Sequence, residues 1–477
     1  MLARGGLRGA AGVSATGTSP SEEKDETGEP LIARKQIKHA QPWLTQAEED
    51  AVASTVASGR LTMGPATKEF EASVAAFAGR THAVAASSGT AALQLALAAK
   101  GVGPGWTVVL PAYTWVATYN AVVLAGATPV LADVDPLAYT IDPAATVAAL
   151  DSAVTGGADP GKMAIMPVHM FGYRAGAGWL PDLARERDLT VIGDGCCSFG
   201  GIAGGERCGA WSPLEAFSFH PRKVVTAGEG GMLLTDDDEV AAKLRALRDH
   251  GAHRSAEQRR QTGAGGPMVP EFELGYNFRI TEMQAALGAA QMLRIGELLR
   301  ARRDVGLRYD ELLVDGPAWL RPPPRLAGGP GAEPDGDDRI LTFYPVTLWG
   351  SRADDAPAKL AASWADGDAA AVAKADKLGA WRDRLMGDLA AAGVAARPPM
   401  LSLPDLPYVQ ERSHLAPTDY PVSSLLARLT FSLPLHHEVT WDDQRQIVRL
   451  LREIPSSWHS LDERIAAVDR ALGKAQS

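Results

Sequence analysis

The stretch HAVAASSGTAALQLALAAK, residues 82–100, decides the fold. A short apolar run at 82–87 leads into a Ser/Gly turn, and apolar residues then recur at helical spacing from 89 to 100. This order predicts a buried strand, a tight turn and a helix, which together begin a βα unit. The turn would lie at the carboxyl end of the strand, where α/β proteins bind their ligands.

Similar short apolar runs follow along the chain, separated by helical segments long enough to cross over a sheet. They predict strands at 107–112, 128–134, 163–169 and 190–195. Two more strands, at 215–220 and 230–236, lie too close together for a helical crossover, and a helix at 238–251 follows them. The pattern therefore predicts an α/β fold with a mostly parallel seven-stranded sheet covered by helices on both faces.

The second half of the chain predicts a smaller α+β domain. One long helix at 283–303 leads into it, and a strand at 339–349 and helices at 379–393 and 440–454 follow, the last capped by Thr440. The predicted organisation is a disordered N-terminal tail at 1–37, a large domain at 38–290, a small C-terminal domain at 291–465 with surface insertions near 322–337 and 351–376, and a tail at 466–477.

Composition excludes several classes of function. A net charge of -10 leaves no basic face for a nucleic acid, and no apolar run reaches the length of a membrane span. The three cysteines have neither a disulfide framework nor zinc-ligand spacing, which fits a reducing cytoplasm. We therefore expect a cytoplasmic protein that uses no metal and acts on small molecules.

The turn SSGTAAL at 87–93 has the small residues that let backbone N–H groups approach an anion at a helix N-terminus. Ser88 and Thr90 add hydroxyl donors, so the turn could cradle a phosphate. An ordinary helix N-cap formed by Ser or Thr is the alternative explanation of the same residues. Neither a Walker lysine nor a GxGxxG pattern is present, which argues against a nucleoside triphosphate or a dinucleotide.

Two other predicted strand ends carry suggestive side chains. Trp115 follows the second strand and could stack on a flat ring, although an aromatic residue at the start of a buried helix more often belongs to the core. Asp194 follows the fifth strand, where a buried carboxylate needs a cation or a donor such as a protonated ring nitrogen. An Asp that caps the next helix is the alternative.

Lys223, in SFHPRKVVTAGEGGM at 218–232, is a candidate nucleophile. A lysine near an apolar site and beside Arg222 can form a Schiff base with an aldehyde, although most lysines are surface residues. Together, a phosphate cradle, a stacking aromatic, a carboxylate and this lysine match the four groups that pyridoxal 5'-phosphate (PLP) offers to a protein.

Residues 40–460 resemble the DegT/DnrJ/EryC1/StrS sugar aminotransferases, which are fold-type-I PLP-dependent transferases. Six ordered blocks carry the resemblance: LTMGPATKEFEASVAAFAG, SSGTAALQLAL, YTWVATYNAVVLAGATPVLADVD, MPVHMFG, SFHPRKVVTAGEGG and LGYNFRITEMQAALGAAQ. YTWVAT and MPVHMFG look closest to inosose aminotransferases and to aminohydroxybenzoate synthases.

The resemblance implies a role for each candidate residue. Lys223 would form the Schiff base, Asp194 would pair with the pyridine nitrogen, and Trp115 would stack on the ring. The phosphate would be held by Gly89, Thr90, Ala91 and Ser218, and by Asn277 from the neighbouring subunit of a homodimer, whose Arg279 would also reach across. Family members usually have glutamine or histidine where this chain has Cys197, and often histidine in place of Phe199.

The function predicted from these residues is PLP-dependent transfer of an amino group. L-Glutamate or L-glutamine would be the donor, a keto-sugar or keto-cyclitol the acceptor, and antibiotic or other natural-product biosynthesis the setting. A PLP-dependent lyase or dehydratase of the aminohydroxybenzoate synthase type is the alternative. A regulator that keeps the fold without turnover is a third reading, favoured only by Cys197 and Phe199.

Overall fold

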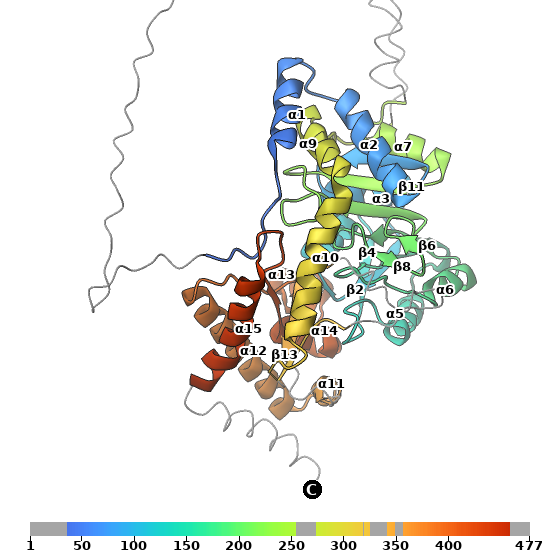
Figure 1. The fold of residues 1–477 in the computed structure, drawn as a ribbon. Coiled ribbons are helices and arrows are strands. Elements are labelled where there is room, and N and C mark those ends of the chain that lie inside the picture. The colour runs from blue at the N-terminus through green and yellow to red at the C-terminus, as the bar shows by residue number, and fades with distance from the viewer. Residues whose placement is uncertain (1–35, 254–272, 318, 325–340, 349–355, 458–477) are drawn as a thin grey trace, which may run out of the picture. The chain divides into compact units, whose positions relative to one another are not determined.

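The computed structural model describes residues 36–253, 273–317, 319–324, 341–348 and 356–457 (Figure 1). From Ile37 onward these residues belong to one compact unit. The tail predicted at 1–37 lies almost wholly outside the described residues. So do most of the 322–337 segment and the C-terminal tail. The division into large and small domains at residue 290 stays a prediction.

A central sheet runs through the N-terminal half of this unit, in the order β1-β11-β10-β7 continued by β6-β5-β2-β4. β6 and β7 are two parts of one strand separated by Ile192, so the sheet has seven strand positions, as predicted. β11 is antiparallel to both of its neighbours, and the other pairings are parallel. The strands are β1 (His82–Ala86), β2 (Thr107–Pro111), β4 (Thr128–Ala132), β5 (Met163–Ile165), β6 (Thr190–Val191), β7 (Gly193–Asp194), β10 (Leu214–Ser218) and β11 (Gly231–Thr235).

Helices connect and cover these strands. α3 (Gly89–Ala99) is almost entirely buried because Ala and Leu occupy nearly all of its positions, so it can pack on the sheet and on other helices at once. The other helices of this half are α1 (Gln46–Ala57), α2 (Pro65–Ala78), α4 (Val116–Leu124), α5 (Pro143–Thr155), α6 (Leu180–Glu186) and α7 (Asp238–Arg248). Short β8 (Ile202–Ala203) and β9 (Glu206–Arg207) form a hairpin.

The long helix predicted at 283–303 is two helices, α9 (Glu282–Leu293) and α10 (Ile295–Leu312), which meet at Arg294. No proline marks the break, and Gly296 lies inside the first turn of α10. Arg294 instead donates to Glu48 of α1 and lies over the Trp43 ring, contacts that only the folded chain provides. α10, the long yellow helix in Figure 1, then leads to the second sheet.

The second sheet has the order β12-β13-β15 and is antiparallel. Its strands are β12 (Leu320–Arg321), β13 (Tyr344–Leu348) and β15 (Thr430–Leu433); its helices are α11 (Ala356–Ala365), α12 (Ala369–Ala391), α13 (Pro407–Ser413), α14 (Pro421–Leu429) and α15 (Trp441–Ser457). Thr440 begins α15 in a reciprocal capping pair with Asp443, as predicted. β14 (Leu401–Ser402) pairs with β3 (Tyr113–Thr114), so a strand from this half joins a segment beside the central sheet.

The segment at 351–376, expected to be a surface insertion, is helical from Ala356 onward. Its Leu360 and Trp364 are buried in the core cluster of this half, with Trp364 only 1% exposed. The Ala/Asp-rich composition hides a narrow apolar stripe along α11 and α12, and this stripe packs into the core. Across the residues that the structure describes, no helix combines the length and apolar character that crossing a bilayer requires.

Candidate active site

Three strand ends meet at one edge of the central sheet. β1 and β10 run parallel to each other because both are antiparallel to the β11 strand between them, and β7 is parallel to β10. Their carboxyl ends therefore face the same way. A Cβ added at Gly89 would lie 2.8 Å from Ser218 Cβ and 3.1 Å from Cys196 Sγ, so only glycine allows this approach.

The first turn of α3 leaves backbone donors free. Ser88 is its N-cap, and its Oγ accepts from the Ala91 N–H at 3.1 Å. Within the described residues, the N–H groups of Gly89 and Thr90 have no protein acceptor. The cap interpretation therefore accounts for Ser88 and Ala91, while Gly89 and Thr90 present two N–H groups at the positive end of a helix, which suits an anion.

Asp194 is 5% exposed and lies at the end of β7. Its Oδ2 accepts from the Thr118 hydroxyl at 2.8 Å, and its Oδ1 accepts from the Cys196 N–H at 3.1 Å. Sequence reasoning missed Thr118, although its position one helical turn after Trp115 offered a signal. The two donors hold the carboxylate in one orientation at the edge of the sheet.

Lys223 is half-buried and approaches the same edge from the loop between β10 and β11. Its Nζ lies 3.2 Å from Cys197 Sγ and 5.9 Å from the centre of the Phe343 ring. Cys197 is buried and follows Asp194 by three residues. The structure thus brings the lysine amine to the strand end that carries the carboxylate, rather than into open solvent.

Trp115 precedes α4 and is 48% exposed, so its ring is not part of the core. It lies on the turn that leads to Thr118, the donor to Asp194. An exposed indole on this turn is available to a flat ligand.

Asn277 is exposed and forms an isolated β-bridge with Asp249 of its own chain. The neighbouring Arg279 pairs with the Asp249 carboxylate, and the Phe278 carbonyl accepts from the Ser87 N–H at 2.9 Å. The segment therefore packs beside the start of the α3 turn, and the Asn277 side chain is left at the surface.

A second polar cluster, which the sequence did not reveal, lies inside the sheet behind this edge. Glu215 of β10 is fully buried and accepts from the N–H groups of Trp211 and Ser212 and from Cys208 Sγ. Burial raises the pKa of Glu215 to about 7. His169 Nε2 lies 3.5 Å from its Oε1, and burial lowers the pKa of that imidazole to about 3, so His169 is neutral.

The edge fits the PLP that the resemblance implies. Two free backbone N–H groups and the Ser218 hydroxyl suit a phosphate, Asp194 suits a protonated ring nitrogen, and Lys223 suits an aldehyde. In the described residues, no cluster of His, Cys, Asp and Glu could hold a metal ion.

Comparison with known proteins supports the same family. The model of the DegT/DnrJ/EryC1/StrS aminotransferase family matches residues 42–326 and 362–452. GDP-perosamine synthase of Caulobacter vibrioides is 33% identical over 390 residues, which cover 81% of this chain and 89% of that protein. The spore coat polysaccharide biosynthesis protein SpsC of Bacillus subtilis is 30% identical over 419 residues, covering 88% and 97%.

A solved structure shares the fold. The DegT DnrJ EryC1 StrS aminotransferase from Brucella abortus superposes with a TM-score of 0.68 at 27% identity, over 86% of this chain and 95% of that one.

Proposed function

Because the chain belongs to the DegT/DnrJ/EryC1/StrS aminotransferase family and is a PLP-dependent enzyme, we propose that it moves an amino group from L-glutamate or L-glutamine to a keto-sugar or keto-cyclitol. The names of its relatives, a GDP-perosamine synthase and a spore coat polysaccharide protein, support a sugar acceptor. We place the reaction in the cytoplasm and in natural-product biosynthesis. The family match favours transfer over elimination, and over a regulator without turnover.

One observation carries this proposal: Lys223 Nζ lies 3.2 Å from Cys197, three residues past the buried Asp194. When bound, PLP supplies an aldehyde and an electron-withdrawing ring. Lys223 would hold the aldehyde carbon through Nζ and, once displaced by the amino donor, carry a proton from the donor's α-carbon. Asp194, fixed by Thr118 and Cys196, would keep the ring nitrogen protonated.

The remaining residues would bind and orient the cofactor. The N–H groups of Gly89 and Thr90 and the hydroxyl of Ser218 would hold the phosphate. Ala91 supports the turn by donating its N–H to Ser88. Trp115, exposed at the start of α4, would cover one face of the ring.

Borohydride treatment of the PLP-loaded enzyme tests the role of Lys223. We expect peptide mapping to find the reduced cofactor on Lys223, and Lys223→Ala to lose at least about a thousandfold in turnover while still binding PLP. Lys162→Ala, which changes an exposed lysine, is the matched control and should leave both results unchanged. Label on another lysine would overturn the assignment.

Two assays address the substrates. Spectral titration with glutamate and with glutamine, without acceptor, should show that one of them converts the cofactor to its amine form. A panel of keto-cyclitols and nucleotide-linked keto-sugars should then identify the acceptor by the return of the original spectrum. If no amino acid changes the spectrum, the transferase proposal fails.

We also propose a homodimer in which Asn277 completes the partner's phosphate site. The exposed Asn277 side chain supports it, as does the nearby Leu274, which is 96% exposed. Mixing Lys223→Ala chains with Asn277→Ala chains should restore activity, because one site of each mixed dimer then carries both native residues. Subunit exchange verified by differential tags, without any gain in activity, would exclude the shared site.

A further inference from the structure

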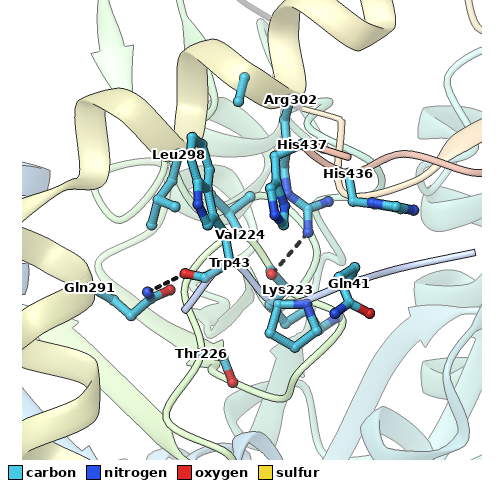
Figure 2. Close-up of a pocket in the computed structure, with 12 residues that line it drawn as sticks. Gln41, Trp43, Lys223, Val224, Thr226, Gln291, Leu298, Arg302, His436 and His437 are labelled. Atoms are coloured by element: carbon cyan, nitrogen blue, oxygen red, sulfur yellow. Dashed lines mark hydrogen bonds between the residues drawn. The ribbon is translucent and has the colours of Figure 1, made fainter. Parts of the chain in front are cut away.

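Arg302, on α10, is a buried cation in the pocket beside Lys223 (Figure 2). It is 7% exposed, and its guanidinium donates to four backbone carbonyl groups. In the described part of the chain, no carboxylate pairs with it. Burial lowers the pKa of Arg302 to about 10, which leaves it charged at neutral pH. Burying a cation without a counter-ion costs free energy. The segments that supply the carbonyl partners therefore indicate what this buried charge does.

The four carbonyl groups belong to two regions. Nη2 donates to the carbonyl of Lys223 at 3.0 Å and to that of Arg222 at 3.4 Å. Nη1 donates to the carbonyl of Thr342 at 3.1 Å and to that of Leu435 at 3.4 Å. Thr342 lies two residues before β13, and Leu435 lies two residues after β15. One side chain therefore joins the lysine loop to the ends of two strands in the second sheet.

The contacts close into a ring that includes the lysine amine. Thr342, whose carbonyl accepts from Arg302, donates its hydroxyl to the Cys197 carbonyl at 2.7 Å. Cys197 Sγ in turn lies 3.2 Å from Lys223 Nζ. Arg302 thus holds the main chain of Lys223, and Cys197 lies against its amine. Thr342 contacts both Arg302 and Cys197 and so connects them.

We propose that Arg302 is a positioning residue that fixes the backbone of Lys223 and ties the amine's location to the second sheet. The inference rests on the proposed role of Lys223. Charge-assisted hydrogen bonds to adjacent carbonyls restrain the loop more strongly than neutral donors do. Displacing a reacting group by about 1 Å can cost about a hundredfold in rate, so a loosened loop impairs the chemical step more than substrate binding.

The test compares Arg302→Met, Arg302→Lys and Arg308→Met. Arg308 lies on the same helix and donates to the Val439 carbonyl of the second half, but it makes no contact with the lysine loop. Arg302→Met removes every hydrogen-bond donor of the side chain but keeps a long unbranched side chain. Arg302→Lys keeps the charge and donors for some of the carbonyls. Arg308→Met controls for the general loss of a hydrogen-bonded, half-buried arginine on α10.

The first readout is hydrogen exchange of the peptide 219–227 in the cofactor-free protein. We expect faster exchange in Arg302→Met, a partial return in Arg302→Lys, and wild-type exchange in Arg308→Met. In the loaded enzyme, kcat should fall about ten- to a hundredfold in Arg302→Met, while the KM for the amino donor changes by less than about threefold. Arg302→Lys should recover part of kcat.

Unchanged exchange in 219–227, or a fall in kcat no larger than that of Arg308→Met, would overturn the proposal. If Arg302→Met does not fold, the same comparison is made between Arg302→Lys and an Arg308→Lys control, and equal exchange in that pair overturns it too. Absence of borohydride label on wild-type Lys223 would instead count against the proposed function. The exchange measurement in cofactor-free protein decides the role of Arg302 separately.

Discussion

Asp194 and Glu215 are buried carboxylates on neighbouring strands of one sheet, yet their surroundings differ. Asp194 ends β7 and accepts from a hydroxyl and one N–H group at the carboxyl edge. Glu215 is the second residue of β10, opposite Gly193, and it accepts from donors that are all buried. A Cβ at Gly195 would lie 2.7 Å from Glu215 Oε1, so Glu215 packs closely against the backbone of the residue after Asp194.

The difference shows that burial alone does not identify a site. Both carboxylates are shielded from water and hydrogen-bonded, as buried polar groups must be. Only Asp194 lies at the strand end, where a ligand can reach it. We therefore expect substitution of Asp194 to change activity, and substitution of Glu215 to change stability.

Asp194→Asn should have the largest effect. An amide cannot keep a pyridine nitrogen protonated, so kcat should fall by at least about a thousandfold while the melting temperature stays near that of the wild type. Steady-state kinetics and PLP retention after gel filtration measure the two parts. Activity within about tenfold of the wild type would break the comparison, because the strand-end carboxylate would then have no chemical role.

Glu215→Gln should alter how stability depends on pH. The pKa of Glu215 in the fold is about 7, above its ordinary value of 4.5, so the folded state binds this proton more tightly than the unfolded state. Its contribution is fully present below pH 4.5 and is lost as the pH rises through 7. The wild type should therefore lose about 3 kcal/mol relative to the variant across this interval.

Denaturant unfolding at several pH values measures this difference. His169 stays neutral throughout, because its pKa of about 3 lies below the interval. The amide oxygen of Gln can still accept from Trp211 and Ser212, so kcat should change by less than about threefold. Parallel pH profiles for wild type and variant would show that Glu215 does not titrate in this range.

The sequence predicted the strand-end residues because periodicity alone locates the end of a strand. The structure places Asp194, Lys223 and Gly89 near this edge of the sheet, and their roles in binding PLP stay a prediction. Glu215 was not foreseen, since one carboxylate inside the apolar run EAFSFH reads as a solvent-facing strand position. Arg302 was not foreseen either, because its four carbonyl partners come from distant segments that sequence spacing does not reveal.

Cys197→Gln should have the smallest effect on activity. It can be compared with a matched variant, because a cysteine lies near each of the two carboxylates. Cys197 Sγ lies 3.2 Å from Lys223 Nζ at the edge, whereas Cys208 Sγ lies 3.0 Å from Glu215 Oε1 in the interior. A thiol is a weak hydrogen-bonding group. The family resemblance implies glutamine or histidine at the position of Cys197. We expect Cys197→Gln to keep kcat/KM within about fivefold, with unchanged melting.

Cys208→Ser is the matched control for that variant. Its hydroxyl is a stronger donor to Glu215, so it should shift the pH profile of stability and leave kcat/KM unchanged. If Cys197→Gln instead abolishes turnover while the protein stays folded and retains PLP, the thiol performs a step that glutamine cannot. A loss of activity in Cys208→Ser would show that the interior cluster communicates with the edge, and the separation drawn between Asp194 and Glu215 would not hold.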